Sequence, residues 1–278
     1  MTGRHGVVRE VDAARRDERE VPLHGGTANR GRVFRVGDTV RRPSRDTAPS
    51  VHALLRHLSD VGFDGAPRHL GTDERGREVL SYVEGIAVTP PYPHWALTDD
   101  ALVSVAELLR DYHRAVASFD PGGRRWSRPP PAPFAGGLVS HNDPNLDNVV
   151  FRDGRAVGLI DFDLACPGSA LWDVACAARL WVPIRPDRYI RDARRGRVPE
   201  RLRLFVDAYG LSRAERARFA EAVRANHRWC YDTVRTGAAR GHAAFAAYWT
   251  VQARRRADAC YRWIAENEAW LHALVGPC

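Results

Sequence analysis

The spacing of apolar residues divides the chain into a short strand-rich part and a longer helical part. Alternating apolar and polar positions predict short strands at 21–23, 32–36, 39–42 and 77–83. Gly37-Asp38 predicts a two-residue turn that joins the second strand to the third. Apolar residues at helical spacing then predict a helix that Thr47 caps, with Pro49 in its first turn and Gly62 after it.

Beyond residue 97 the spacing is mainly helical. Thr98 is expected to cap a helix that continues to Val116, and two short strands are expected around the turn at Asp153-Gly154. Further helices are predicted at 172–182, 198–209, 212–236 and 241–274. We therefore expect an α+β protein with a charged lead-in at 1–20, a small β-rich lobe at 21–84 and a larger, mainly helical lobe at 85–278.

The basic residues change this picture little. All 42 of them are arginine, and the net charge is +8. Such usage is typical of a GC-rich genome, so the charge does not by itself indicate a nucleic-acid partner, and no basic helix with interleaved aromatic residues stands out. The absence of lysine excludes a Walker-type phosphate loop and a Schiff-base lysine.

Other composition signals point to an ordinary intracellular protein. The first 20 residues contain no apolar run, and no stretch has the apolar length needed to cross a membrane. The five cysteines are scattered without CxxC spacing. We expect a cytoplasmic protein with reduced cysteines, no membrane partner, and a monomeric or homodimeric state.

A cluster of Asn, Asp and His residues carries the strongest chemical signal. His141, Asp143 and Asn148 have the spacing H-x-D-x-x-x-x-N, and Asp161-Phe162-Asp163 follows one predicted hairpin later. Asp173 comes next, near the start of a predicted helix. Asn, Asp and Pro also form turns readily, so the first segment alone could be structural. The second aspartate segment, at this hairpin distance, favours a catalytic interpretation.

This arrangement resembles the aminoglycoside phosphotransferase and choline kinase branch of the protein kinase-like superfamily, in particular the type common in actinobacteria. The resemblance implies a two-lobe kinase fold that binds ATP, with GTP as an alternative, together with Mg²⁺. It also implies transfer of the γ-phosphoryl group to a hydroxyl of a small-molecule acceptor, either an antibiotic such as an aminoglycoside or a metabolite.

The residue types fit phosphoryl transfer, which needs a cation, a positioned hydroxyl and charge compensation. Asn148 and Asp161 offer the oxygen ligands that Mg²⁺ prefers. Asp143 is placed to accept a hydrogen bond from the acceptor hydroxyl as the base. His141 is expected to brace the loop, and Asp173 to hydrogen-bond backbone groups near it. Asp163 is left open: it faces the metal, faces the substrate or caps the turn at 167–168.

Three segments are expected to form the nucleotide site. Gly25, Gly26 and Thr27 form a plausible phosphate-covering loop, although a flexible hairpin would look similar. The segment with Ser81 and Val83 resembles the hinge that holds adenine through backbone groups, and an ordinary buried strand would show the same pattern.

The family's third strand carries a phosphate-holding cation, and here Arg41 takes its place. The predicted turn pairs Phe34 with Arg41 and Val36 with Thr39, so these four residues share one face. Arg42 is the alternate should the turn length differ.

One departure from the family concerns the predicted helix before Gly62, whose residues 50–58 lack the acidic partner of that cation and have His52 near its place. This absence motivates an alternative function, a nucleotide-binding pseudokinase that acts as an immunity or regulatory protein.

The acceptor is not readable from motifs. Arginines dominate residues 185–203, which argues against a cationic aminoglycoside there. Several aromatic residues could line a choline-like pocket, although at helical spacing they more often form core: Trp229, Tyr231, Tyr248, Trp249, Tyr261 and Trp263.

Overall fold

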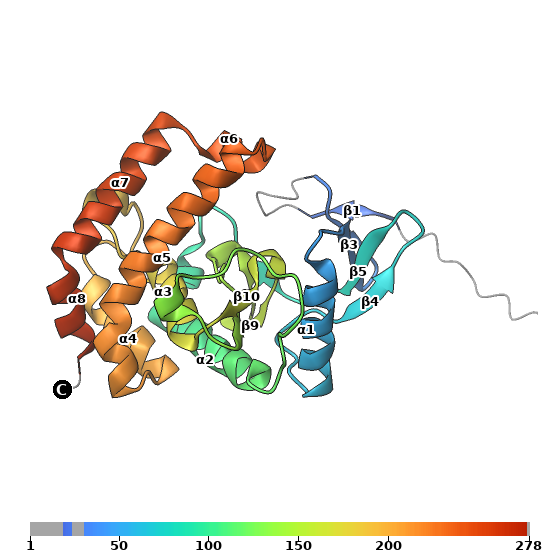
Figure 1. The fold of residues 1–278 in the computed structure, drawn as a ribbon, viewed down its shortest axis with the longest axis horizontal. Coiled ribbons are helices and arrows are strands. Elements are labelled where there is room, and N and C mark those ends of the chain that lie inside the picture. The colour runs from blue at the N-terminus through green and yellow to red at the C-terminus, as the bar shows by residue number, and fades with distance from the viewer. Residues whose placement is uncertain (1–18, 24–30, 277–278) are drawn as a thin grey trace, which may run out of the picture.

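The computed structural model describes residues 19–23 and 31–276, which form two lobes (Figure 1). The small lobe is an antiparallel five-stranded sheet with one helix, α1 (Ala48–Asp60). Its strands follow the order β1 (Val21–Pro22), β2 (Phe34–Val36), β3 (Thr39–Pro43), β5 (Arg77–Ser81) and β4 (His69–Thr72). The two-lobe α+β architecture expected from the sequence is confirmed. Strand β4 was not predicted.

Local sequence signals explain the elements of the small lobe. The turn at Gly37 pairs Phe34 with Arg41 and Val36 with Thr39, as predicted. Pro49 lies in the first turn of α1, but Thr47 makes no side-chain cap hydrogen bond. The predicted apolar face of α1 is buried, with Leu54 and Leu58 fully covered.

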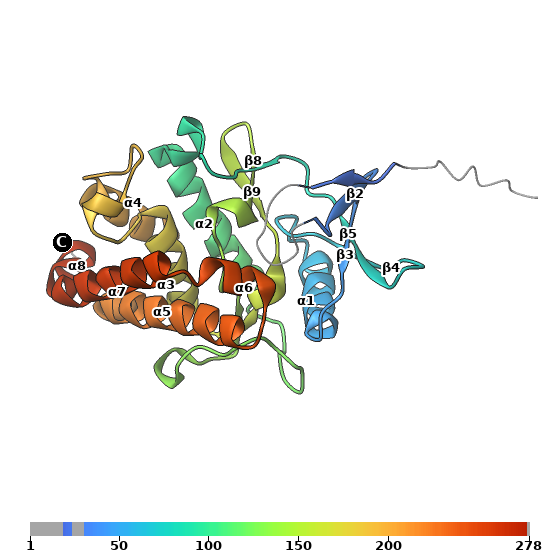
Figure 2. The same ribbon diagram turned by 90° about the horizontal axis from the view of Figure 1, so that it is seen from above.

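The large lobe combines helices with two small sheets (Figure 2). Strands β6 (Ile86–Ala87), β8 (Val149–Arg152) and β9 (Arg155–Leu159) form one sheet, and β7 (Leu138–Ser140) pairs with β10 (Cys166–Gly168). The helices are α2 (Asp99–Val116), α3 (Ala170–Trp181), α4 (Val198–Tyr209), α5 (Arg213–Ala239), α6 (Ala243–Tyr248), α7 (Val251–Glu266) and α8 (Glu268–Val275). As predicted, Thr98 caps α2, and Asp153 and Gly154 both take positive φ in the β8–β9 turn.

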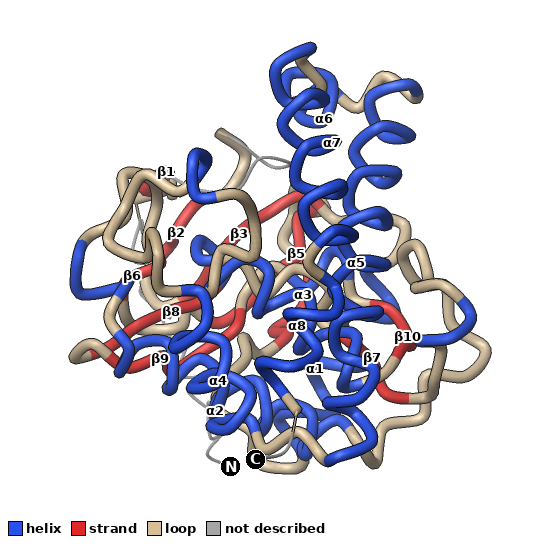
Figure 3. The backbone as a smooth tube through the Cα atoms, turned by 90° about the vertical axis from the view of Figure 1, so that its left-hand side faces the viewer, coloured by secondary structure: helices blue, strands red, loops and turns tan. Residues whose placement is uncertain are grey.

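Buried side chains of α2 and α3 belong to the core of the large lobe, and the course of both helices can be followed in Figure 3. Tyr112 on α2 and Trp172 and Trp181 on α3 are fully buried. Their polar atoms are all used: Trp172 donates to Asn142, Trp181 to the Pro144 carbonyl and Tyr112 to the Val139 carbonyl. These bonds fix β7 and the segment that follows it to the helical core, because a buried donor without a partner is costly.

The predicted single helix over 241–274 is wrong. The structure divides this region into α6, α7 and α8. Thr250 is extended and its hydroxyl accepts a hydrogen bond from the Ala253 N–H, so a new helix begins there. Asn267 ends α7 and precedes α8. Apolar residues keep their helical spacing across these breaks. The sequence signal that marks the first break is the capping residue Thr250.

Aromatic side chains in this region differ in burial. Trp229, in the C-terminal half of α5, is buried, whereas Tyr248 at the end of α6 is 65% exposed. Within the part of the chain that is described, no helix has the length and apolar character needed to cross a membrane.

Candidate active site

The segment that follows β7 holds the candidate base. Asn142 adopts a left-handed backbone conformation, φ 65°, which turns the chain immediately before Asp143. Asn145 then opens a short 3₁₀ turn (Leu146–Asn148) with its side-chain oxygen on the Leu146 N–H. The Asn148 amide donates to both the backbone carbonyl and the Oδ2 atom of Asp143, at 3.0 and 2.9 Å. Asp143 and Asn148 therefore form one rigid unit.

Asp161 lies next to this unit because two hairpin strands connect them. It follows β9 and also has a left-handed backbone, with φ 62°. The Ile160 N–H donates to the Asn148 carbonyl at 2.9 Å. Burial raises the pKa of Asp143 well above its usual range, and the Asp161 carboxylate raises it further.

His141 braces this connection, as expected from the sequence. Its Nε2–H donates to the Ile160 carbonyl at 3.0 Å, and its Nδ1 accepts the Asp143 N–H at 3.3 Å. This pattern requires the neutral imidazole, and burial lowers the pKa of His141 accordingly. The ring is fully covered, so His141 positions the loop and does not reach the cavity.

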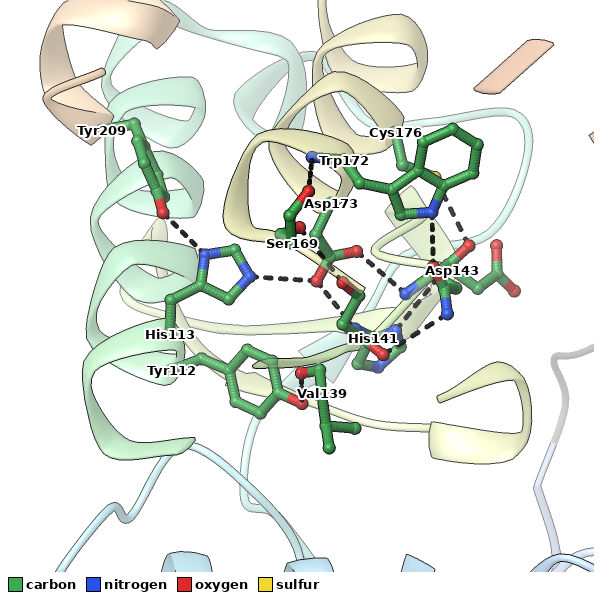
Figure 4. Close-up of polar contacts among 12 residues, drawn as sticks. Tyr112, His113, Val139, His141, Asp143, Ser169, Trp172, Asp173, Cys176 and Tyr209 are labelled. Carbon is green, nitrogen blue, oxygen red and sulfur yellow. Dashed lines mark hydrogen bonds and ion pairs between the residues drawn. The ribbon is translucent and has the colours of Figure 1, made fainter. Parts of the chain in front are cut away.

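Asp173, at the start of α3, holds the same loop from the other side (Figure 4). Its carboxylate accepts the backbone N–H groups of His141 and Asn142 at 2.7 and 2.9 Å. Burial alone would raise the pKa of Asp173, but the hydrogen bond from His113 and the backbone N–H of His141 help to lower it below its usual range. The predicted backbone contact of Asp173 is thus present in the structure.

His113 on α2 is a site residue that the sequence reasoning missed. Its Nε2 lies 3.1 Å from Asp173 and its Nδ1 lies 2.7 Å from the Tyr209 hydroxyl (Figure 4). The sequence feature that could have identified it is a histidine next to Tyr112 on an apolar helix face, where a polar ring without a partner would be unfavourable. Only the fold showed that its partner is Asp173.

The cation that faces the cavity between the lobes is Arg42, and the prediction of Arg41 is corrected. Arg41 lies on the outer face of β3, where it hydrogen-bonds Thr39 and lies 3.9 Å from Asp73. The strand register was right, but the face that lines the cavity carries Val33, Val40 and Arg42. Alternation along a strand fixes which residues share a face and does not say which face turns toward the other lobe.

Arg42 is buried among three carboxylates. Its guanidinium lies 2.7 Å from Glu78, 3.0 Å from Asp161 and 2.9 Å from Asp163. Burial alone would lower its pKa, but these carboxylates raise it above the ordinary value. Asp163 also lies 2.5 Å from Arg45. These ion pairs connect Asp163 of the large lobe to the small lobe, and its expected role at the metal, at the substrate or at the turn 167–168 stays a prediction.

Glu78 supplies the acidic partner that α1 lacks. It lies on β5, directly opposite Arg42 in the β3–β5 ladder, and its side chain is 2% exposed. His52 from α1 contacts it at 2.8 Å. The helix therefore reaches the cation indirectly, through a histidine and a strand carboxylate.

A cavity of about 370 Å³ lies between the lobes, beside these residues. Ser81 and Val83 line one side, and Asp147, Asn148 and Asp161 line the other. The predicted hinge thus borders the cavity. The predicted phosphate loop with Gly25, Gly26 and Thr27 lies outside the described residues.

The oxygen donors at this cavity fit a divalent cation. Because the Asn148 nitrogen is held by Asp143, the Asn148 amide oxygen is directed away from that bond and has no protein partner among residues 19–23 and 31–276. Asp161 uses Oδ1 for Arg42, which leaves Oδ2. No group of three or more His, Cys, Asp or Glu residues suited to a metal is present in the described part, so a cation here would share its shell with phosphate oxygens or water.

The sequence is similar to a known family and to a named relative. The family model of the phosphotransferase enzyme family matches residues 124–209. A trifolitoxin immunity protein of Rhizobium leguminosarum bv. trifolii is 37% identical over 219 residues, covering 73% of this chain and 79% of that protein.

Solved structures share the fold at low identity. A choline/ethanolamine kinase family protein from Mesorhizobium loti superposes with a TM-score of 0.63 and 18% identity, over 94% of both chains. The GDP complex of aminoglycoside 2'-phosphotransferase-IIIa gives a TM-score of 0.54 and 14% identity, over 93% of this chain and 92% of that one.

Proposed function

Because the chain belongs to the phosphotransferase enzyme family, we propose that it transfers the γ-phosphoryl group of ATP to a hydroxyl of a small molecule. The observation that carries the proposal is the unit formed by Asp143 and Asn148, with Asp161 beside it, at the edge of the interlobe cavity. A hydroxyl base, two oxygen donors for a cation and a buried arginine meet there, which are the parts that phosphoryl transfer needs.

Each residue of this site has a distinct role in the proposed reaction. Asn148 fixes the Oδ2 atom of Asp143, so the other carboxylate oxygen is oriented to accept a hydrogen bond from the acceptor hydroxyl and then its proton. Asn148 and Asp161 would hold Mg²⁺, which when bound supplies positive charge that offsets the charge on the phosphate oxygens. Arg42 offers a permanent cation at the same edge.

The nucleotide would lie in the cavity with its base near Ser81 and Val83. A related fold has been solved with GDP bound, which supports a nucleotide ligand here and keeps GTP as an alternative to ATP. The volume of about 370 Å³ is in the range of small-ligand sites.

The relative named as an immunity protein supports a second candidate function. In that alternative the chain binds nucleotide and protects the cell without turnover. Glu78 weakens one argument for it, since Arg42 does have a buried acidic partner.

Replacing Asp143 with Asn separates the two functions. As an enzyme, the protein should consume ATP in the presence of one acceptor from a panel of aminoglycosides, macrolides, amino alcohols and sugars, and D143N should reduce turnover at least about 100-fold with nucleotide affinity retained. Acceptor-dependent ATP or GTP loss that is equal in D143N and the unsubstituted protein would contradict the assigned base. No acceptor-dependent loss at all, with a protective effect in cells that survives D143N, would favour the alternative.

A further inference from the structure

Cys176 and Cys230 face each other across two packed helices of the large lobe, α3 and α5. On α3, Arg179 comes one turn after Cys176 and shares its face. On α5, Cys230 comes one turn after Asn226 and shares its face. Arg179 donates to the Asn226 side-chain oxygen and to the Cys230 sulfur, both at 3.1 Å, so the two faces are turned toward each other. The side chains of Cys176 and Cys230 hydrogen-bond there, and the proposed reaction uses neither of them.

The surroundings of Cys230 favour its thiolate. A guanidinium at 3.1 Å donates a charge-assisted hydrogen bond, which stabilises a negative sulfur more than a neutral thiol. In agreement with this contact, the hydrogen bond from Cys176 and the charge of Arg179 lower the pKa of Cys230 to about 6. Cys230 is also partly exposed, which gives small molecules access to it. A partly exposed thiolate beside a fixed cation is the arrangement of a reactive cysteine.

Two further cysteines of the described chain have different surroundings. Cys166 and Cys260 are buried, and burial raises the pKa of both thiols, to about 11 for Cys166. The Cys166 thiol contacts the Ser127 backbone carbonyl at 3.5 Å. Both are expected to react slowly at neutral pH, so they serve as controls within the same chain.

Cys176 connects this pair to the catalytic loop, residues 141–148 (Figure 4). Its sulfur lies 3.4 Å from the Asn142 carbonyl oxygen, and Asn142 directly precedes Asp143, the candidate base. The Asn142 side chain accepts a hydrogen bond from Trp172 of the same helix. Helix α3 therefore holds the residue before the base from two positions, and one of them is a thiol.

We propose that Cys176 and Cys230 form a redox-sensitive pair, in which a peroxide oxidises Cys230 and Cys176 then closes a disulfide with it. The inference goes beyond the proposed phosphotransfer function and does not depend on the acceptor.

The two steps balance with hydrogen peroxide as the oxidant. The Cys230 thiolate attacks one peroxide oxygen, so that an S–O bond forms, the O–O bond breaks, and the released hydroxide takes up a proton to become water. Cys230 is then a sulfenic acid. The Cys176 sulfur attacks the Cys230 sulfur, so that an S–S bond forms, the S–O bond breaks, and hydroxide leaves with the Cys176 proton as a second water. The two sulfurs together lose two electrons, which the peroxide gains.

The disulfide has a consequence for the catalytic loop. Once Cys176 is oxidised, it has no hydrogen to donate to the Asn142 carbonyl. The loop then loses one of its contacts to α3 directly before Asp143. Oxidation should therefore loosen the loop, and reduction of the disulfide should restore it.

The first test measures the ionisation of Cys230 in the full, reduced chain. Alkylation by iodoacetamide is followed at each cysteine by peptide mass spectrometry between about pH 5 and pH 10. We expect the rate at Cys230 to rise with a midpoint at about pH 6, and at pH 7 to exceed the rates at Cys166 and Cys260 at least about 10-fold. A midpoint at about pH 8.5, the value of an ordinary thiol, would overturn the inference.

Variants assign this effect to the arginine contact. R179Q should raise the midpoint by at least about 1 pH unit, because the cation beside the sulfur is removed. R228Q is the matched control, at an exposed arginine of the same helix as Cys230 that pairs with Asp232, and it should leave the midpoint unchanged. Equal midpoints for R179Q and R228Q would contradict the role of Arg179. The pH profile of the unsubstituted chain stands whether or not R179Q folds.

The second test follows the disulfide and its effect on the loop. The reduced chain is treated with hydrogen peroxide, its remaining thiols are blocked with N-ethylmaleimide, and it is digested without reductant. Mass spectrometry should find a peptide pair joined through Cys176 and Cys230. C176A should stop at a sulfenic acid on Cys230 that dimedone traps, whereas C260A should form the same disulfide as the unsubstituted chain.

Amide hydrogen exchange of the unsubstituted chain reports the loop directly. Peptides that cover residues 141–148 should exchange at least about 5-fold faster after oxidation and return to the original rate with dithiothreitol. Absence of the Cys176–Cys230 peptide pair, or a disulfide that leaves exchange in this loop unchanged, would overturn the inference.

Discussion

At the scale of single residues, the charge arrangement of the site depends on which charged side chains are buried. Arg42 and Glu78 face each other across two strands, with side-chain exposures of 8% and 2%. Removing one member of such a pair leaves the other charge buried, which costs far more than the loss of a surface ion pair. Arg41, one position earlier, has only a distant carboxylate partner on the outer face.

Replacing Arg42 with Gln should therefore have two effects. Thermal or chemical denaturation should show a loss of about 3 kcal/mol of stability, because the buried Glu78 carboxylate loses its arginine partner. Nucleotide affinity should fall at least about 10-fold, because the cation at the cavity edge is lost. R41Q is the matched control, with losses of at most about 1 kcal/mol and little change in affinity. Equal effects of R41Q and R42Q would contradict the placement of Arg42 in the site.

At the scale of elements, close backbone approach decides how the lobes are joined. Gly85 follows the hinge and has φ 142°, in the region that favours glycine. A Cβ atom there would lie 2.5 Å from the Phe151 carbonyl oxygen and 2.6 Å from Val150 on β8. The hinge therefore lies directly against the strand that follows Asn148, and no side chain fits between them.

Replacing Gly85 with Ala should destabilise the protein by about 2–5 kcal/mol, since backbone strain and steric overlap add. G76A is the control, because Gly76 also has positive φ, 72°, but open space around its would-be Cβ. It should lose only about 1 kcal/mol from strain. Chemical denaturation of both variants measures the difference, and a G85A loss no larger than that of G76A would rule out the steric contribution.

At the scale of the whole molecule, buried charge distribution sets the response to pH. His227 on α5 contacts the Ala257 carbonyl on α7 at 2.9 Å, so it connects two helices of the large lobe. Burial, together with the charges of Arg179 and Arg185, lowers the pKa of His227 to about 4. The unfolded chain takes up a proton near pH 6.5, but the folded chain resists until about pH 4. Stability is thus lost as the pH falls from 6.5 toward 4.

The contribution of this histidine is measurable by difference. The free energy of unfolding should fall by about 3 kcal/mol more between pH 7 and pH 4 in the unsubstituted protein than in H227Q, in which no ring titrates. Glutamine keeps a donor for the Ala257 carbonyl. H272Q, at an exposed histidine of α8, should leave the pH slope unchanged. Parallel pH profiles for H227Q and the unsubstituted protein would contradict the assignment.

Local sequence determined the strand register of the small lobe and the main motif of the site. The turn at Gly37 fixed the β2–β3 register, and the spacing of His141, Asp143 and Asn148 with Asp161 after one hairpin indicated a phosphotransferase-like site. These features depend on neighbouring residues, whose geometry follows from backbone conformation and side-chain alternation. The family's identity followed from the same short segments.

Tertiary structure decided what depends on partners distant in sequence. In the folded chain Arg42 faces the cavity and pairs with Glu78 from another strand. His113 contacts Asp173, which lies 60 residues later in the sequence. Charge pairing and burial are properties of the assembled lobes. The pattern along a strand or helix therefore predicts which residues share a face, and the packing of that face decides what each residue contacts.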